Sequence, residues 1–201
     1  MKLQGPALFL IVPLALAACG GSAPPPADMP PTASDMPSTA GTPPATGTSS
    51  TTSSRTIDVP IAAKSDSKLS GTATFTEVEG GVRVQVKVAG APPGKIATHV
   101  HEKGDCSAPD GASAGGHFNP ANLPHALPPA AERHLGDLGN IDIGADGTGT
   151  IEIVIKGASL KEGEPSSFLG RAIIVHAKQD DGGQPVGNAG GRIGCGVIAG
   201  R

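Results

Sequence analysis

Hydrophobic and polar residues alternate along much of the chain after residue 54. Residues 82–88 read Val-Arg-Val-Gln-Val-Lys-Val, and residues 69–75 alternate apolar or small residues with polar ones. Because successive side chains of a strand point to opposite faces, this period of two predicts strands with one buried face. The residues between the two runs, Glu79-Gly80-Gly81, predict a tight turn, so the pair reads as a hairpin.

Short segments elsewhere in the chain also have the composition of strands. They are residues 57–62, 96–101, 148–155, 171–178 and 196–199. Asp146-Gly147, just before residue 148, is a second hairpin signal, and no segment shows a sustained helical period. Seven or eight short strands in one domain predict an all-β fold, an antiparallel sandwich or barrel.

Two long connections interrupt the strand pattern. Residues 102–140 are rich in Gly, Pro and Ala, and residues 179–194 are rich in Gly. Connections of this length without strands of their own are usually functional or else disordered. We expect both to be functional loops on a scaffold of strands.

The N-terminus resembles an export signal. Lys2 precedes a mostly apolar stretch, residues 6–18, which is shorter than the roughly 20 residues needed to span a bilayer. The stretch ends in Leu16-Ala17-Ala18-Cys19, similar to the bacterial lipoprotein cleavage box. Residues 1–18 are therefore predicted to be a lipoprotein signal peptide, and Cys19 to be lipidated and to anchor the protein to a membrane. An ordinary signal peptide that happens to contain a cysteine is the alternative.

Residues 19–54 are predicted to be a tether. Apart from Cys19 they contain almost only Gly, Ser, Ala, Pro and Thr, a composition that cannot bury enough apolar surface to offset the entropy of ordering. We therefore expect a disordered linker between the lipid and a folded domain of residues 55–201. Gly20 follows the cysteine instead of Asp, which favours the outer membrane of the cell envelope, facing the periplasm.

The charge balance argues against a nucleic-acid partner. The chain has 15 Lys and Arg against 18 Asp and Glu, for a net charge of −3. It has no Trp or Tyr and only four Phe, so it offers neither a basic patch nor an aromatic platform. The core must be built mainly from Val, Ile, Leu and Ala.

The chain has three cysteines, an odd number for an exported protein. If Cys19 carries lipid, Cys106 and Cys195 remain to form a disulfide, which export would permit. Two free buried thiols are the alternative. A disulfide that closes a loop of about 90 residues would raise the free energy of unfolding by about 4–5 kcal/mol, because it lowers the entropy of the unfolded chain.

All six histidines lie in patterns that suit metal binding. His99 and His101 project from the same face of a predicted strand, because residues i and i+2 of a strand point the same way. His176 lies in another predicted strand, where a lone histidine would more often be a hydrogen-bonded core residue. The long loop adds His117, His125, His134 and Asp137. Six imidazoles and one carboxylate suffice for two metal ions that share a ligand.

Five stretches resemble the copper/zinc superoxide dismutases of the bacterial exported type. They are THVHEKGDC at 98–106, SAGGHFNP at 113–120, RHLGDLGN at 133–140, VHAKQDD at 175–181 and GNAGGRIGCGV at 187–197. They follow the family order within residues 57–199. The resemblance implies an eight-stranded antiparallel Greek-key barrel with two long functional loops. It also implies one copper and one zinc ion per subunit.

The resemblance implies a role for each of these side chains. The copper ligands would be His99, His101, His117 and His176, and the zinc ligands His117, His125, His134 and Asp137. His117 would thus bridge the two metals. Asp180 would link a copper-binding histidine to a zinc-binding one, Arg192 would lie beside the copper, and Cys106 and Cys195 would form the intrasubunit disulfide.

The implied activity is dismutation of superoxide to oxygen and hydrogen peroxide. Arg192 would attract the anionic substrate, and His117 could supply a proton. The loop between His176 and Arg192 lacks the acid- and lysine-rich stretch of eukaryotic relatives, so electrostatic guidance from it is in doubt. Two alternatives remain open. A non-catalytic copper-binding or delivery module of this family would lack a copper-binding histidine or the arginine, and a copper-only enzyme would lack a zinc ligand; this chain has all of these residues.

Subunit contacts differ within the family, and a homodimer is one arrangement that the family allows.

Overall fold

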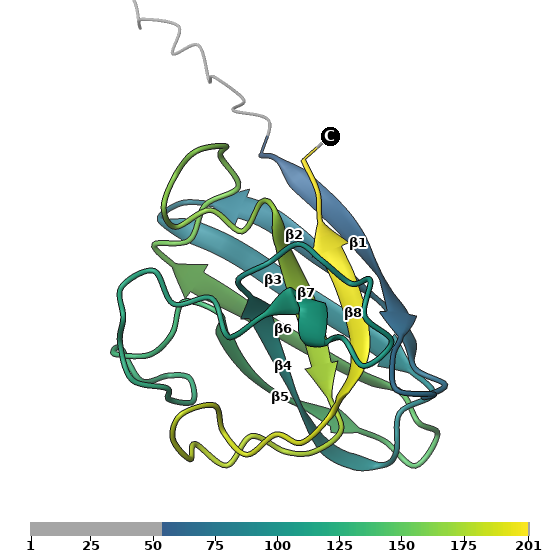
Figure 1. Ribbon diagram of the computed structural model, residues 1–201. Coiled ribbons are helices and arrows are strands. Elements are labelled where there is room, and N and C mark those ends of the chain that lie inside the picture. The colour runs from purple at the N-terminus through teal and green to yellow at the C-terminus, as the bar shows by residue number, and fades with distance from the viewer. Residues whose placement is uncertain (1–53, 201) are drawn as a thin grey trace, which may run out of the picture. The chain divides into compact units, whose positions relative to one another are not determined.

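The computed structural model describes residues 54–200, which form a closed antiparallel barrel (Figure 1). Around the barrel the strands run in the order β1-β2-β3-β6-β5-β4-β7-β8. Their bounds are β1 Thr56–Ala63, β2 Ser70–Val78, β3 Gly81–Ala89, β4 Gly94–His101, β5 Asp137–Ile143, β6 Gly149–Lys156, β7 Arg171–His176 and β8 Arg192–Ile198. Because β3 pairs with β6 and β4 with β7, the chain crosses over twice instead of forming hairpins throughout. The predicted all-β, eight-stranded barrel is confirmed.

The alternation of β3 places its four valines inside the barrel. All four are buried, whereas Arg83 and Lys87 between them are exposed. Opposite them on β2, Ala73 pairs with Val86 and Phe75 with Val84, so both strands present apolar side chains to the same interior. The few aromatic rings lie together, with Phe168 at 6.0 Å from the ring of Phe75 and 6.0 Å from that of Phe118.

Several strand boundaries differ from the sequence-based prediction, chiefly those of β5, β7 and β8. β5 lies at the end of what was predicted to be a loop, because its sequence DLGNIDI is buried at nearly every position and so lacks alternation. β8 begins at Arg192, four positions before the predicted start, and β7 ends at His176. The glycines of β8 carry no side chain that could reveal a period of two.

The long connection between β4 and β5 folds back along the end of β4. Val100 N donates to Gly136 O at 2.9 Å, and Phe118 N donates to Val100 O at 2.8 Å. A Cβ at Gly136 would overlap the carbonyl oxygen of Val100, so only glycine fits this close approach. The backbone of the loop is thereby fixed to the barrel, and the loop can hold side chains in defined positions.

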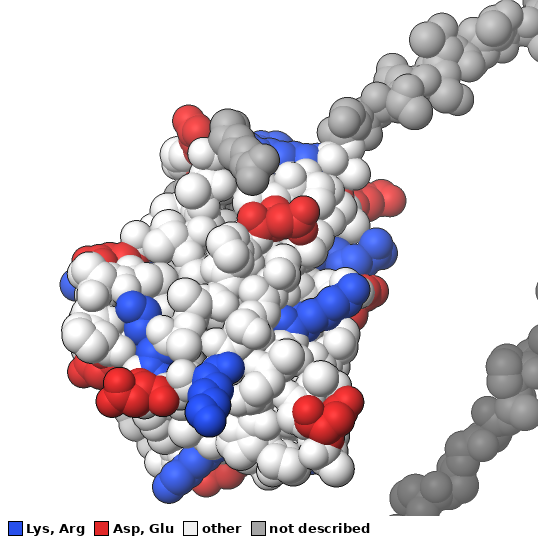
Figure 2. All heavy atoms as spheres, turned by 90° about the vertical axis from the view of Figure 1, so that its right-hand side faces the viewer, with Lys and Arg blue, Asp and Glu red and all other residues white. Residues whose placement is uncertain are grey.

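Within residues 54–200 the one helical segment is the single 3-10 turn η1, Ala112–Ala114. No helix in this part of the chain is long and apolar enough to cross a membrane. On the face of the barrel domain shown in Figure 2, basic and acidic side chains are interspersed and separated by uncharged surface. Charges on that face are therefore balanced locally.

Candidate metal centre

Two groups of buried side chains could each hold a metal ion. The first comprises His99, His101, His117 and His176, and the second His117, His125, His134 and Asp137. In each group the potential ligand atoms lie within 4.8 Å of one another. The structure therefore brings together all seven predicted ligands, and His117 belongs to both groups.

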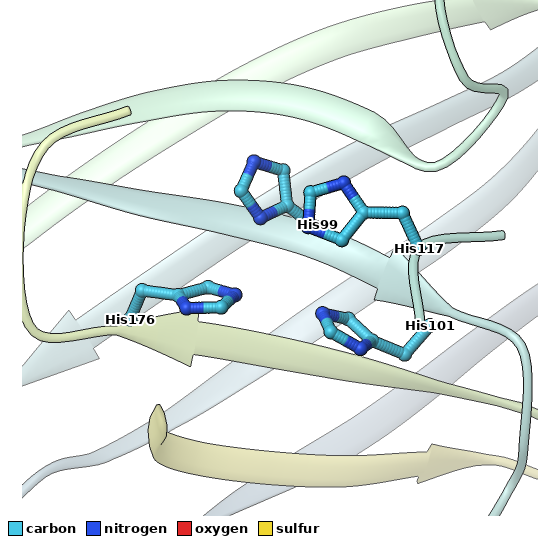
Figure 3. A group of neighbouring side chains, drawn as sticks. All are labelled: His99, His101, His117 and His176. Atoms are coloured by element: carbon cyan, nitrogen blue, oxygen red, sulfur yellow. The ribbon is translucent and has the colours of Figure 1, made fainter. Parts of the chain in front are cut away.

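The first group is assembled by two neighbouring strands and one loop (Figure 3). His99 and His101 lie on β4, which pairs with β7, the strand that ends at His176. His117 comes from the β4–β5 loop and forms an isolated bridge with His101. Figure 3 shows the four rings arranged around a common space.

Unpartnered ring nitrogens show that this group fits a metal. His99 Nδ1, His101 Nε2 and His176 Nε2 are buried and have no hydrogen-bond partner. The other nitrogen of each ring is engaged, with Asp180 Oδ2 at 2.9 Å, Gly115 O at 2.9 Å and Gly190 O at 3.3 Å, respectively. Buried polar atoms are rarely left unpaired, and metal-binding histidines usually use their second nitrogen in this way.

The second group has the spacing of a tetrahedral zinc site. His117 Nδ1 and His134 Nδ1 lie 3.3 Å apart, and Asp137 Oδ1 lies 3.0 Å from the first and 3.3 Å from the second. Ligands about 2.0 Å from a tetrahedral Zn²⁺ are about 3.3 Å from one another. His125 Nδ1 lies 3.0 Å from Asp137 Oδ2 without the geometry of a hydrogen bond. Three imidazoles and a carboxylate suit zinc.

Asp180 lies between the two groups. Its Oδ2 is 2.9 Å from His99 Nε2, and its Oδ1 is 3.0 Å from His125 Nε2. Asn140 on β5 holds the backbone of Asp180 through two hydrogen bonds, of 2.8 and 2.9 Å. The carboxylate therefore orients one ring from each group.

Burial and hydrogen bonding keep these side chains in the protonation states that metals require. Burial lowers the pKa of His99 to about 4, of His101 to about 2 and of His176 to about 3, so all three are neutral at pH 7. Burial alone would raise the pKa of Asp137, but its hydrogen bond with His117 and the nearby imidazoles outweigh that effect and lower it. The pKa of Asp180 is likewise lowered, because its hydrogen bonds with His99 and His125 outweigh burial.

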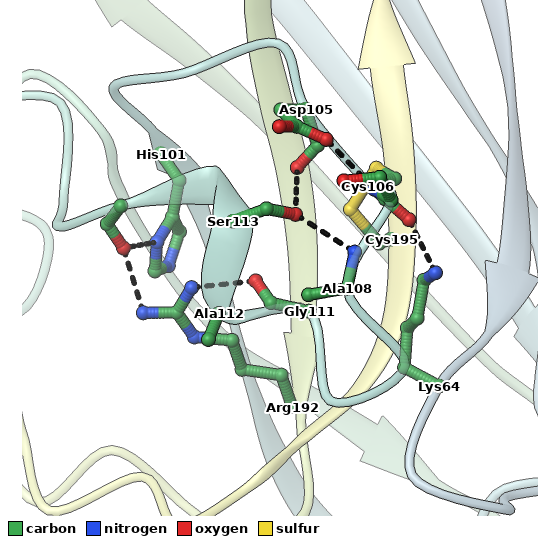
Figure 4. The surroundings of a disulfide bond; sticks show 12 residues. Lys64, His101, Asp105, Cys106, Ala108, Gly111, Ala112, Ser113, Arg192 and Cys195 are labelled. Carbon is green, nitrogen blue, oxygen red and sulfur yellow. Dashed lines mark hydrogen bonds between the residues drawn. A yellow bond between two sulfur atoms is a disulfide. The ribbon is translucent and has the colours of Figure 1, made fainter.

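Arg192 lies at the edge of the first group (Figure 4). It pairs with His176 across β7 and β8. Its guanidinium donates to Gly111 O at 2.7 Å and to Gly115 O at 2.6 Å. Gly115 O also contacts His101 Nδ1, so one carbonyl joins the arginine to a histidine of the first group.

The predicted disulfide is confirmed. Cys106 in the β4–β5 loop is bonded to Cys195 on β8, with the two Cα atoms 5.9 Å apart. The bond joins the loop that supplies Gly111 and Gly115 to the strand that carries Arg192.

Sequence reasoning missed Gly115 and Asn140 as parts of the site. Gly115 acts through its backbone carbonyl, which leaves no side-chain pattern to detect. Asn140 had a weak signal, as an amide close to the apolar residues Leu138 and Ile141.

Comparison with known proteins identifies the family. Residues 69–198 match the family described as copper/zinc superoxide dismutase. The chain belongs to the copper/zinc superoxide dismutase family. This is a family of oxidoreductase enzymes whose cofactors are copper and zinc, and the two ligand groups could bind these ions.

Relatives of this superoxide dismutase family member agree in sequence and fold. An extracellular copper/zinc superoxide dismutase of Brugia pahangi is 40% identical over 152 residues, which cover 70% of this chain and 74% of the relative. A crystal structure of a double mutant of a SOD-like protein from Bacillus subtilis has a TM-score of 0.64 and 35% identity, over 71% of this chain and 97% of that one. The clock protein EA4 has a TM-score of 0.63 and 39% identity, over 71% and 92%.

The predicted signal peptide of residues 1–18, the lipidation of Cys19 and most of the predicted linker lie outside the described residues.

Proposed function

We propose that the protein dismutes superoxide to oxygen and hydrogen peroxide at a binuclear copper–zinc centre. The observation that carries the proposal is the pair of buried ligand groups that share His117. Copper held by His99, His101, His117 and His176 would supply one-electron redox chemistry, whereas zinc has none and would contribute structure and charge.

Arg192 is proposed to bind the substrate anion beside the first group. A guanidinium is always charged and attracts a small anion such as superoxide. Its two hydrogen bonds to backbone carbonyls leave little freedom for the side chain, so the charge stays near His101 and His176.

His117 is proposed to carry a proton for the product. Its Nδ1 faces the second group, 3.0 Å from Asp137 Oδ1, so Nε2 is the nitrogen left for the first group. A proton taken up at Nε2 would lie next to the incoming anion. Nε2 could carry this proton only while it is not bound to copper, so His117 would alternate between bridging the two groups and giving a proton to the peroxide product.

We further propose that the protein is exported and anchored by lipid. Residues 1–18 would be the signal peptide, and Cys19 the lipidated first residue of a protein on the outer membrane, facing the periplasm. The disulfide supports export, because such bonds persist in oxidising compartments. The extracellular relative from Brugia pahangi is consistent with an exported protein.

A non-catalytic copper-binding or delivery module is the second candidate. It is considered because similar structures include a SOD-like protein from Bacillus subtilis and the clock protein EA4, whose names do not state dismutase activity. The presence of every ligand together with Arg192 favours the enzyme.

Superoxide decay measured by pulse radiolysis separates the two candidates. The protein loaded with one copper and one zinc should accelerate decay far above the spontaneous rate. As a class, superoxide dismutases work near the diffusional ceiling of about 10⁸–10⁹ M⁻¹s⁻¹. A fully loaded protein that leaves the decay unchanged would instead support the copper-binding module.

A further inference from the structure

The turn between β1 and β2 lies against the segment that carries Arg192. Lys64 N donates to Ile193 O at 2.9 Å, which extends the β1–β8 ladder by one bond. The hydroxyl of Ser65 donates to Arg192 O at 2.8 Å, and that of Ser67 donates to Ile193 O at 2.6 Å. Three hydrogen bonds therefore fix the backbone at Arg192 and its neighbour from a turn more than 120 positions earlier in the chain.

The same turn also holds the loop that receives the guanidinium. The ammonium group of Lys64 donates to Cys106 O, and Ser65 N donates to Pro109 O at 2.9 Å. This loop continues to Gly111 and Gly115, whose carbonyls accept from Arg192. Figure 4 shows Lys64 reaching the loop at Cys106 and Arg192 reaching it at Gly111. Residues 64–67 thus contact both the backbone of Arg192 and the loop whose carbonyls accept hydrogen bonds from its guanidinium.

The conformation of the turn is costly for the residues it contains. Ser65 and Asp66 have φ angles of 51° and 57°, in the left-handed region that is unfavourable for residues other than glycine. The turn is closed by Ser67 N donating to Lys64 O at 3.0 Å. Glycine at residue 65 would relieve the strain but would remove the hydroxyl that contacts Arg192.

We propose that residues 64–67 position Arg192, with Lys64 and Ser65 as the positioning residues. Neither side chain touches the histidines. Lys64 holds the carbonyl-bearing loop, and Ser65 holds the arginine backbone, so both act on the substrate anion through Arg192. The inference rests on the proposed function, because it assigns the turn to the anion-binding part of that site.

The test uses the full chain loaded with copper and zinc and compares Lys64→Met, Arg192→Ala and the double variant. Azide, a monovalent anion, is titrated and its Kd followed by the absorption change of Cu(II), alongside kcat/KM for superoxide. Lys64→Met should weaken azide binding about three- to tenfold, the effect of one lost hydrogen bond, and lower kcat/KM by a similar factor. Lys64→Arg, which keeps charge and donor, should restore most of both.

Two comparisons separate positioning from direct electrostatic attraction. In the Arg192→Ala background, Lys64→Met should have no further effect on either quantity. The matched control Lys87→Met removes an exposed lysine on β3 and should leave both quantities unchanged. Equal effects of Lys64→Met with and without Arg192, or an effect of Lys87→Met of the same size, would overturn the proposal.

Ser65→Gly keeps the inference testable if Lys64→Met does not fold. It preserves charge and relaxes the backbone, so it should leave the unfolding temperature unchanged or raise it while weakening azide binding. Unaltered azide affinity in this variant would refute the role of Ser65. If the wild-type protein bound azide through Arg192 but did not dismute superoxide, the proposed function would fail while the positioning role could still be judged from azide.

Discussion

His99, His101 and His176 of the first group each use their two ring nitrogens for different purposes. One nitrogen is fixed by a carboxylate or a backbone carbonyl, and the other is buried and unpartnered. The histidine patterns together with the family resemblance predicted the candidate ligands, because ligands must be particular side-chain types. They could not predict the partners that orient them, since Gly115 and Gly190 contribute only backbone oxygens.

Arg192→Ala should reduce activity without loss of copper. The arginine contacts two carbonyl oxygens and is not among the ligands, so copper content measured by mass spectrometry should stay at one per chain. The value of kcat/KM should fall about tenfold, because the variant lacks the positive charge that attracts the substrate anion. Arg192→Lys, which keeps the charge without the paired carbonyl contacts, should lie between. A variant with wild-type kcat/KM would exclude the anion-binding role.

The metal-free protein should lose stability as the pH falls. The folded-state pKa of His99, His101 and His176 lies below the ordinary value of 6.5, so the unfolded chain binds protons first. The contribution of these three neutral histidines to the free energy of unfolding is complete above about pH 6.5, and it is lost as the pH falls toward about 4 and below. From His99 alone, the free energy of unfolding should decrease by about 3 kcal/mol between pH 7 and pH 4. Urea unfolding in the presence of a chelator measures this, and a free energy that is constant or increases on acidification would contradict it.

At the scale of elements, the barrel provides two histidine-bearing strands, and the loop closes over them. The alternating strands β2 and β3 were predicted from the sequence because each has one buried and one exposed face. Strand β5 was not, because it is covered on both sides and its pattern has no period of two. The path of the β4–β5 loop also escaped prediction, since backbone hydrogen bonds and a glycine contact set it.

Gly136→Ala should displace the β4–β5 loop. The added Cβ would overlap Val100 O, so the backbone must shift, which we expect to cost about 2 kcal/mol of unfolding free energy. Because His134 and Asp137 flank this position, zinc affinity measured by competition with a chelator should fall as well. Gly191→Ala, where the Cβ would meet no atom within 4 Å, is the matched control and should change neither quantity appreciably. Unchanged zinc affinity in Gly136→Ala would show that the loop does not depend on this contact.

At the scale of the whole molecule, one covalent bond and one side chain connect regions distant in sequence. The disulfide joins residues 89 positions apart, and His117 connects two ligand groups drawn from β4, β5, β7 and the long loop. The cysteine pairing followed from counting and from the expected fate of Cys19. The contacts that hold Arg192 could not be predicted in this way, because they come from the β1–β2 turn, the disulfide-bonded loop and β8.

Replacing both cysteines by serine should destabilise the barrel domain by about 3–5 kcal/mol, because the unfolded chain regains the entropy of a long loop. Urea unfolding of Cys106→Ser/Cys195→Ser measures the loss. A reductant should produce a similar loss in the wild-type protein and none in the double variant. Equal stabilities of wild type and variant would show that the bond contributes nothing to the fold.

The shared His117 is tested most directly by electron paramagnetic resonance of the protein carrying Cu(II) in the first group and Co(II) in the second. If one imidazole bridges the two ions, their unpaired electrons couple, and the Cu(II) signal should be strongly weakened relative to protein with copper and zinc. A Cu(II) signal of the same intensity and shape with cobalt as with zinc would contradict the bridged binuclear centre.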